Sequence, residues 1–361
     1  MNSIDVKFFL GSNTKRGFVP LFDKLKKPET GHRFYILKGG PGSGKSTLMR
    51  RIAKTLMEHG HFVEFMPCAS DPDSLDAIYD HDGQIAIVDG TAPHILDPDY
   101  PGAYDIIINM ADAWSNTTIE ENKQNIIELS REISGCHRMA TACIKSAAAL
   151  LDQNRLIAEK YLDRYKISDF AGSLIKKLDG ADLGEESHRL LSAVTVGKLL
   201  FFDKTISSLC KDVYIIEDEW GAASTAILSE IRDYAIKMNL AFISCYCSIN
   251  VPDKIDHILF PSIGLGISTS NSYHSADGNF RIQAQELMNP VNDYELAGMN
   301  KHSLLARELI DLAANHVAQA KNLHDRLEKY YISAMDFSKV DEIYQRLIED
   351  ILSFSIRPFS T

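Results

Sequence analysis

The chain has 361 residues, of which 45% are hydrophobic and 24% charged, a composition ordinary for a globular protein and long enough for about two domains. Its formal net charge of −11 disfavours nucleic acid as the main partner, because proteins that bind nucleic acid usually present a basic surface. There is no apolar run of membrane-spanning length, and the first residues include Asp5 but no apolar stretch with a cleavage site. We therefore expect a cytoplasmic protein with reduced cysteines and no membrane span.

The first distinctive segment is "FFLGSNTKRGF", in which Lys15 and Arg16 precede Gly17. The two cations could contact a phosphate in the same chain or stabilise transferring charge across an interface. They could equally lie in a solvated loop, and the sequence leaves these roles open.

Residues 33–47 read "RFYILKGGPGSGKST" and predict a strand, a glycine-rich turn and the start of a helix. The apolar run Phe34–Leu37 is typical of a short buried strand, and apolar residues recur at helical spacing after the turn. The turn itself fits the Gly-x4-Gly-Lys-Ser pattern of a phosphate-binding P-loop. Glycines let backbone N–H groups approach phosphate oxygens, and the N-terminus of the following helix favours an anion.

This pattern assigns a role to each residue of the turn. Lys45 would reach the β- and γ-phosphates and steady the transferring charge, and the Ser46 hydroxyl would bind Mg²⁺. The expected nucleotide-binding residues are Gly39, Gly40, Pro41, Gly42, Ser43, Gly44, Lys45, Ser46 and Thr47.

Residues 84–94, "QIAIVDGTAPH", predict the carboxylate that a magnesium site of this kind needs. The apolar strand Ile85–Val88 leads directly into Asp89, which we expect to be a catalytic and metal-binding residue. His94 is a candidate base, with Asp97 and Asp99 as the other local candidates, and His94 could alternatively be a structural hydrogen-bonding residue at a turn. Gly90 stands where many fast ATPases carry a glutamate, so we expect slow hydrolysis or transfer to an acceptor other than water.

Helical periodicity predicts long helical sections at about 117–178 and about 298–353. Packing of these helices on each other and on the cores is the simplest interpretation. A lid or partner-binding arm is the alternative, with a hinge at 166–172, "KISDFAG".

The same landmarks recur at an offset of about 179 residues, which indicates an internal duplication. For example, "PDSLDAI" at 72–78 corresponds to "PDKIDHI" at 252–258. We therefore expect two tandem α/β domains of P-loop type, 1–180 and 181–361. Each would be a three-layer domain, a mostly parallel sheet with flanking helices, and would carry one of the helical extensions.

The second copy has lost the chemistry of its loop, which falls within "IIEDEWGAASTA" at 215–226. At the repeat offset, Lys45 corresponds to Ser224, or to Ala223 if the alignment slides by one, and Asp89 corresponds to Thr269. The turn instead carries three acidic side chains and one bulky one, and it contains no cation to offset the negative charge. These residues are Glu217, Asp218, Glu219 and Trp220. Because these carboxylates would repel a triphosphate, we expect the second copy to be a structural mate that does not bind Mg·ATP.

Four motifs carry a resemblance to known proteins: "FFLGSNTKRGF", "ILKGGPGSGKSTLM", "CASDPDSLDAI" and "VDGTAPHILDPDYPGA". They resemble the P-loop NTPase superfamily and, more narrowly, a bacterial family of tandem P-loop ATPase-like proteins. The resemblance spans both halves and implies that 39–47 bind nucleotide and that Asp89 is Walker-B-like. In that family the second half often keeps its own P-loop, and this chain departs from the family there.

These observations favour ATP and Mg²⁺ as cofactors, with ATP preferred over GTP because no "NKxD" guanine-binding signature is present. Three hypotheses follow. The first is a slow Mg-dependent ATPase whose nucleotide state changes the packing of its two halves. The second is a small-molecule or nucleotide kinase, and the third is a non-hydrolysing, nucleotide-gated scaffold for a protein partner.

Overall fold

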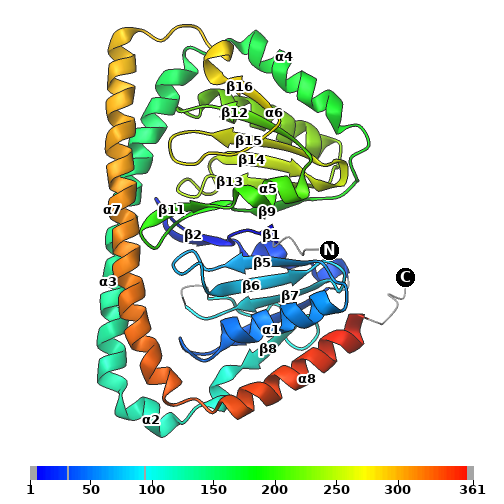
Figure 1. Cartoon of the computed structure of the whole chain (residues 1–361), viewed down its shortest axis with the longest axis vertical. Coiled ribbons are helices and arrows are strands. Elements are labelled where there is room, and N and C mark those ends of the chain that lie inside the picture. The colour runs from blue at the N-terminus through cyan, green and yellow to red at the C-terminus, as the bar shows by residue number, and fades with distance from the viewer. Residues whose placement is uncertain (1–5, 31, 93–94, 356–361) are drawn as a thin grey trace. The chain divides into compact units, whose positions relative to one another are not determined.

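The computed structural model describes residues 6–30, 32–92 and 95–355 as an α/β structure with two six-stranded sheets (Figure 1). Internal contacts divide the chain into two compact units. The N-sheet unit contains Lys7–Gly11, Pro20–Arg138 and the chain from His316 onward. The C-sheet unit consists chiefly of Ser12–Val19 and Met139–Asn315.

The N-sheet unit is built on one mixed sheet. Its strands, in spatial order, are β1 (Val6–Lys7), β5 (Val63–Pro67), β6 (Leu75–Asp80), β7 (Ile85–Asp89), β4 (Arg33–Lys38) and β8 (Asp105–Asn109). β4 pairs in parallel with β7 and β8, whereas β6 runs antiparallel to both β5 and β7. The carboxyl ends of β4 and β7 therefore lie side by side, which is where ligands bind in open α/β sheets.

The C-sheet unit repeats this arrangement. Its strands, in spatial order, are β9 (Glu186–Arg189), β13 (Phe242–Tyr246), β14 (Ile255–Phe260), β15 (Leu265–Ser270), β12 (Asp212–Glu217) and β16 (Phe280–Gln283). β12 pairs in parallel with β15 and β16, and β14 is the strand that runs antiparallel to both neighbours. Both sheets are thus mixed, and one antiparallel strand in each interrupts the mostly parallel arrangement expected from the sequence.

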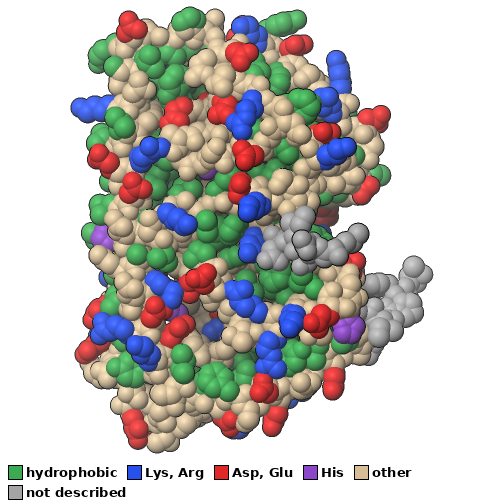
Figure 2. Space-filling view, viewed as in Figure 1, with side chains coloured by type: hydrophobic (Ala, Val, Ile, Leu, Met, Phe, Trp, Pro, Cys, Tyr) green, Lys and Arg blue, Asp and Glu red, His purple; other side chains and the backbone are tan. Residues whose placement is uncertain are grey.

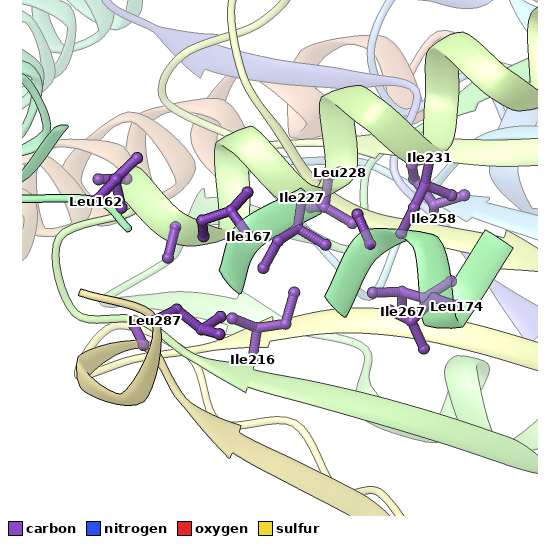
Figure 3. Packing of buried hydrophobic residues seen from close by; sticks show 14 of the residues in the cluster. Leu162, Ile167, Leu174, Ile216, Ile227, Leu228, Ile231, Ile258, Ile267 and Leu287 are labelled. Atoms are coloured by element: carbon purple, nitrogen blue, oxygen red, sulfur yellow. The ribbon is translucent and has the colours of Figure 1, made fainter. Parts of the chain in front are cut away.

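In each sheet a helix follows the strand next to one edge: α1 (Lys45–Glu58) follows β4 and α6 (Ala222–Lys237) follows β12. In the C-sheet unit, α6 also packs against α4 (Arg164–Ile175), whose Ile167, Ala171 and Leu174 share one buried face. Figure 3 shows side chains from both helices and the sheet meeting in this cluster. Burial of side chains of this size stabilises a fold by about 1.5–3 kcal/mol each.

The helical sections are exchanged between the two units. α4 belongs to the first half of the chain but packs in the C-sheet unit. α8 (Phe337–Ser355) belongs to the second half but packs against α1 in the N-sheet unit, through apolar residues such as Val340 and Leu347 (Figure 1). The compact units therefore differ from a division of the chain at residue 180.

Two long helices, α3 (Lys123–Glu159) and α7 (Asp293–Ile332), contribute residues to both units. The helical sections expected from the sequence are present, but the break in the first lies at 160–163, because Asp163 caps α4 by accepting a hydrogen bond from the Lys166 amide at 3.2 Å. The segment 166–172 is helical and is not a hinge.

The remaining elements are short. They are β2 (Gly11–Thr14), β3 (Gly17–Pro20), β10 (Ser192–Thr195), β11 (Lys198–Phe201), α2 (Asn116–Glu121), α5 (Asp203–Leu209) and 3-10 turns at Phe22–Leu25, Pro28–Thr30, Met110–Ala113, Lys176–Leu178, Pro261–Ile263 and Ala284–Leu287. Across the described part of the chain, no helix combines the length and apolar character needed to cross a membrane. Acidic and basic side chains are interspersed on the face shown in Figure 2.

Candidate functional site

The loop Gly39–Gly44 connects the carboxyl end of β4 to the first residue of α1. Gly42 and Gly44 have φ values of 71° and 87°, a left-handed conformation that only glycine adopts without strain. Gly44 precedes the helix with no side-chain cap, so the loop turns backbone amides toward the space in front of α1. Such a helix start favours an anion, because unpaired N–H groups and the helix dipole meet there.

The Lys45 side chain stabilises this loop by hydrogen bonds to the loop's backbone carbonyls. Its ammonium donates to the carbonyl oxygens of Gly39 and Gly40, each at 2.8 Å, and lies 3.5 Å from a carboxylate oxygen of Asp89. The lysine side chain is only 9% exposed. A buried ammonium between the loop and Asp89 is a cation placed to meet a polyanion at the N-terminus of α1.

Asp89 ends β7 beside this ammonium. Burial raises the pKa of its carboxyl above the usual range, the Lys45 charge acts in the opposite direction, and a further carboxylate, Asp76, raises the pKa again. The carboxylate of Asp89 accepts a hydrogen bond from the Thr91 amide at 2.9 Å, and the Thr91 hydroxyl donates to the Gly39 carbonyl at 2.9 Å. Thr91 therefore ties the end of β7 to the glycine-rich loop.

The other residues assigned from the sequence have distinct positions. Ser46 accepts a hydrogen bond from the Leu75 amide at 2.9 Å, which places its hydroxyl at the start of β6. Ser43 is buried and donates to the Gly40 carbonyl at 2.8 Å, whereas Thr47 is exposed on α1. Pro41 is half-buried within the loop. His94 lies outside the described residues.

Two residues of this site were missed from the sequence: Asp76 and Thr91. Asp76 lies on β6, is 5% exposed, and is close enough to Asp89 to influence its pKa. The signal was a carboxylate inside the otherwise apolar run "LDAIY", since a charge is rarely buried without a partner or a function. Thr91 offers no comparable signal in sequence.

The oxygen ligands available here are of the kinds that magnesium prefers. Ser46 offers a hydroxyl, and Asp89 and Asp76 offer carboxylates. Within the described residues, no carboxylate accepts a hydrogen bond from an amide of the loop 39–44. The residues present therefore fit both a magnesium ion and the phosphate groups of a nucleotide.

The end of α7 and the start of α8 cover the outer side of this loop. A β-carbon on Gly40 would lie 2.6 Å from the Cδ1 atom of Tyr331, and one on Gly42 would lie 2.9 Å from the Cγ1 atom of Ile332. The glycines are thus required for the approach of another helix as well as for backbone conformation. Any shift of the loop on ligand binding would therefore displace the side chains at the end of α7.

The corresponding loop of the C-sheet unit, Asp218–Gly221, is shorter. It has four residues between β12 and α6, compared with six between β4 and α1. Gly221 has φ 74° and caps α6 as Gly44 caps α1. This corrects the sequence alignment: the position of Lys45 is taken by Ala222, not by Ser224 or Ala223, because the turn has lost two residues.

The strand register assigns the counterpart of Asp89. Asp89 pairs with Leu37, the residue before the end of β4, and Thr269 pairs with Ile216, the residue before the end of β12. Thr269 therefore occupies the Asp89 position, as the alignment predicted. A threonine hydroxyl cannot supply the negative charge that a metal ion requires there.

A cation is nevertheless present at the second loop, contrary to the sequence prediction. Lys254, just before β14, lies next to Gly221, and its ammonium is 2.5 Å from an Asp256 carboxylate oxygen. Lys254 holds the pKa of Asp256 down at about 2, although burial acts to raise it. Potential metal-ligand atoms of Asp256, His257 and His274 lie within 4.8 Å of one another, but the Lys254 ammonium already neutralises this carboxylate.

Lys15 and Arg16 are engaged in ion pairs in the C-sheet unit. The Lys15 ammonium lies 3.1 Å from Asp152 and 3.2 Å from Asp253, and Arg16 lies 2.8 Å from Asp253. Their charges are thus balanced by carboxylates.

Comparison with known proteins gives one match. Residues 19–91 match the family model described as Novel STAND NTPase 3. The matched segment contains β4, the glycine-rich loop, α1, Asp76, Asp89 and Thr91. No match was found among curated proteins or among solved structures. The part of the chain that builds the N-sheet site is therefore similar to a family of nucleoside triphosphatases.

Proposed function

We propose that the N-sheet unit binds Mg·ATP at residues 39–47 and hydrolyses it slowly. The observation that carries this proposal is the placement of Lys45, buried between the glycine-rich loop and Asp89 at the N-terminus of α1, where no side chain caps the helix. The match of 19–91 to an NTPase family supports the same function. ATP rather than GTP follows from the absence of a guanine-binding signature in the sequence.

The residues divide the work of phosphoryl transfer. The loop amides and the helix dipole hold the phosphates, and Lys45 leaves the carbonyls of Gly39 and Gly40 to meet the negative charge of the γ-phosphoryl group. Ser46 and Asp89 would hold Mg²⁺, which would supply positive charge to offset that of the phosphates. Asp76, buried near Asp89, is a second carboxylate available to the metal or its water shell.

The expected turnover is slow because the residue directly after Asp89 is not a glutamate. The next residue, Gly90, has no side chain, and its carbonyl accepts a hydrogen bond from the Lys38 ammonium at 2.9 Å. An attacking water would have to be oriented by Asp76 or by a residue outside this loop. This arrangement suits a nucleotide switch better than a rapid energy-consuming enzyme.

The C-sheet unit would be an inactive structural and regulatory partner. The two sheets share one strand order and one pattern of strand direction, which supports descent of 1–180 and 181–361 from a duplicated ancestor. Ala222 and Thr269 replace the lysine and the aspartate of the first site. Helix α7 is one element shared by both units, so its contact with Gly40 offers a path from nucleotide state to the partner.

Nucleotide titration with product analysis tests the proposal. Purified protein is mixed with ATP, GTP and a non-hydrolysable ATP analogue, with and without Mg²⁺, and binding and ADP formation are measured. We expect Mg-dependent ATP binding and slow ADP release without an added acceptor. ADP formation that requires a metabolite would instead show a kinase, and tight binding without turnover a scaffold.

A matched pair of lysine variants locates the activity. Lys45→Ala should abolish tight Mg·ATP binding or turnover, while Lys54→Ala, on the exposed side of the same helix, should leave both unchanged. Equal behaviour of the two variants would refute the assignment of the site to this loop.

A further inference from the structure

The N-terminus of α6 already holds an anion, and that anion is a side chain of the protein. One carboxylate oxygen of Asp218 accepts hydrogen bonds from the amides of Trp220 at 3.2 Å and Gly221 at 2.9 Å. The other accepts from the amide and the hydroxyl of Ser224, at 2.8 and 2.9 Å. Asp218 is 2% exposed, so four donors and the dipole of a 16-residue helix converge on a buried carboxylate.

A buried cation and a small cavity lie next to this carboxylate. The Lys254 ammonium lies beside Gly221, and its pKa is raised in part by Asp218 and Asp256, although burial opposes this. A cavity of about 60 Å³ adjoins the group and is lined by Asp218, Gly221 and Lys254. This volume exceeds the roughly 10–15 Å³ that one water molecule needs.

Two buried polar atoms in the lining of this cavity have no hydrogen-bond partner among the described residues: the Asn250 amide oxygen and the Trp220 indole nitrogen. Asn250 is 4% exposed. Buried polar groups are nearly always hydrogen-bonded, so unpaired ones beside a cavity indicate space for a water molecule or a ligand.

The loop before α1 and the loop before α6 differ in the groups that accept hydrogen bonds from their backbone amides. In the N-sheet unit, no described carboxylate reaches the amides of 39–44, and the cation is Lys45 at the first position of α1. In the C-sheet unit, Asp218 fills the corresponding position, and the cation is Lys254 from the segment before β14. Both loops thus have a lysine and a glycine at the start of the helix, but the lysine comes from different elements, and only the second loop has a carboxylate of the chain on its amides.

We propose that Asp218 is a built-in substitute for a tetrahedral oxyanion, which keeps the second loop permanently occupied. The loop would have lost its exchangeable ligand while keeping the anion that its amides and Lys254 require. This explains why the frame of a nucleotide site persists without its phosphate-binding residues. The proposal deepens the inactive role proposed for the C-sheet unit, but it does not depend on ATP binding at the first loop.

A direct consequence is that removal of the carboxylate should open an oxyanion site. The Asp218→Ala variant would leave the amides of Trp220, Gly221 and Ser224 and the Ser224 hydroxyl without an acceptor, next to the Lys254 ammonium. Inorganic phosphate or sulfate offers oxygen acceptors and negative charge of the required kind.

The test uses the full chain in a Lys45→Ala background, so that phosphate binding at the first loop is weakened equally in every sample. Phosphate binding is measured by calorimetry and by the midpoint of thermal unfolding, with chloride at matched ionic strength as the reference. We expect Asp218→Ala to bind phosphate about tenfold or more tightly than its parent, because a preformed anion site has been vacated. Addition of Lys254→Met together with Asp256→Asn, which leaves no unpaired buried carboxylate, should abolish this gain in protein that circular dichroism shows to be folded.

A second carboxylate cap provides the control. Asp163 caps α4 in the same unit by accepting from the Lys166 amide, and Asp163→Ala should lose stability without gaining phosphate affinity. If folded Asp218→Ala gains no phosphate affinity over its parent, Asp218 is an ordinary helix cap and the proposal is overturned. If the variant is insoluble, refolding in phosphate and in chloride decides between the two: recovery only in phosphate supports the proposal, and equal failure overturns it.

Discussion

The ring of Tyr331 lies against the α-carbon of Gly40, so that a β-carbon at position 40 would lie 2.6 Å from the Cδ1 atom of the ring. Tyr331 is near the carboxyl end of α7, and Gly40 belongs to the loop that is expected to hold the phosphates. Two segments separated by most of the chain are thus in close contact. The contact makes the loop sensitive to the position of α7, and α7 sensitive to what the loop binds.

The first prediction is that Gly40→Ala destabilises the protein through this contact. The added methyl group would overlap the Tyr331 ring, and overpacking of this kind costs about 1–3 kcal/mol. Unfolding by urea, followed by circular dichroism, measures the loss. In the double variant with Tyr331→Ala, the cost of the alanine at position 40 should largely disappear.

A glycine in open space provides the control for this cycle. Gly172 lies within α4, and a methyl group added to its α-carbon would meet no heavy atom within 4 Å, so Gly172→Ala should stabilise the protein by about 0.5–1 kcal/mol. If the effects of Gly40→Ala and Tyr331→Ala are simply additive, the two residues are not coupled and the contact does not constrain the loop.

The second prediction concerns the charge of Asp89. Burial raises its pKa in the folded protein, so its ionised form opposes folding and the opposition grows as pH rises through that folded pKa. Asp89→Asn should therefore raise the free energy of unfolding at neutral pH, and the gain should fade as the pH falls toward about 4, the ordinary pKa of an aspartate. The same variant should lose Mg-dependent ATP binding.

Thermal unfolding and nucleotide titration of Asp89→Asn at pH 7 give both readouts in one experiment. A variant that is more stable and unable to bind Mg·ATP would separate function from stability at this position. A variant that is less stable at pH 7 would show that the ion pair with Lys45 outweighs the cost of burial.

The glycine-rich loop, its flanking strand and helix, and the carboxylate at the end of β7 could be predicted from sequence because their patterns are local. Lys45 and Asp89 each sit at a fixed position relative to a strand or helix, so spacing alone placed them. The antiparallel course of β6 and β14 could not be read in this way, since strand direction depends on connections that hydrophobic runs do not encode.

Contacts between segments far apart in the sequence could not be predicted either. Neither the packing of α4 and α8 in opposite units nor the arrival of Lys254 at the second loop leaves a local signal, because partner choice is decided by which apolar faces and charges meet in three dimensions. Similarly, Asp218 resembles a repelling charge in sequence, but the structure turns it into an acceptor for the α6 amides.

The third prediction is that Lys254→Met strongly destabilises the C-sheet unit. The lysine side chain is 15% exposed and Asp256 is 3% exposed, so loss of the cation leaves a buried carboxylate unpaired. Removal of one partner of such a pair typically costs about 3–5 kcal/mol. Hydrogen exchange resolved by peptide should show the loss at β12–β16, with little change at β4–β8.

Two further variants calibrate this result. Lys237→Met, at the exposed end of α6, should be nearly neutral. In the Lys254→Met background, Asp256→Asn should recover part of the lost stability, because it removes the unpaired charge. A Lys254→Met protein as stable as its parent would show that the ion pair contributes nothing to this core.

The last prediction is a pH dependence of the C-sheet unit that is set by His257. The ring is buried and lies against the His274 ring at a centroid distance of 5.2 Å, and burial followed by the His274 charge lowers the pKa of His257 to about 3. Lys254 lowers this pKa further and Asp256 opposes it. The folded protein therefore keeps this imidazole neutral where an unfolded chain would protonate it.

The sign of the effect follows from proton uptake. Above an ordinary histidine pKa of about 6.5, neither state binds the proton and His257 has no influence on stability. As the pH falls below that value, only the unfolded chain takes up the proton, so the free energy of unfolding declines by up to about 1.4 kcal/mol per pH unit toward the folded pKa. Burial also lowers the pKa of His274, so that ring adds to the same decline. Asp256, whose pKa is about 2 in the folded protein, reduces stability only below about pH 4, where the unfolded chain begins to protonate it, so it contributes little between pH 7 and pH 5.

Urea unfolding at pH 7 and pH 5 should therefore show a marked loss of stability in the parent protein and a smaller loss in His257→Gln. His59→Gln, which changes an exposed histidine at the end of α1, should leave the pH dependence as it is in the parent. Equal slopes for His257→Gln and the parent would mean that His257 takes up its proton in the folded state as readily as in the unfolded chain. In that case the cluster of Asp256, His257 and Lys254 would be open to water. The ion pair between Lys254 and Asp256 would then not be buried, and it could not fix Lys254 beside the second loop as the contacts indicate.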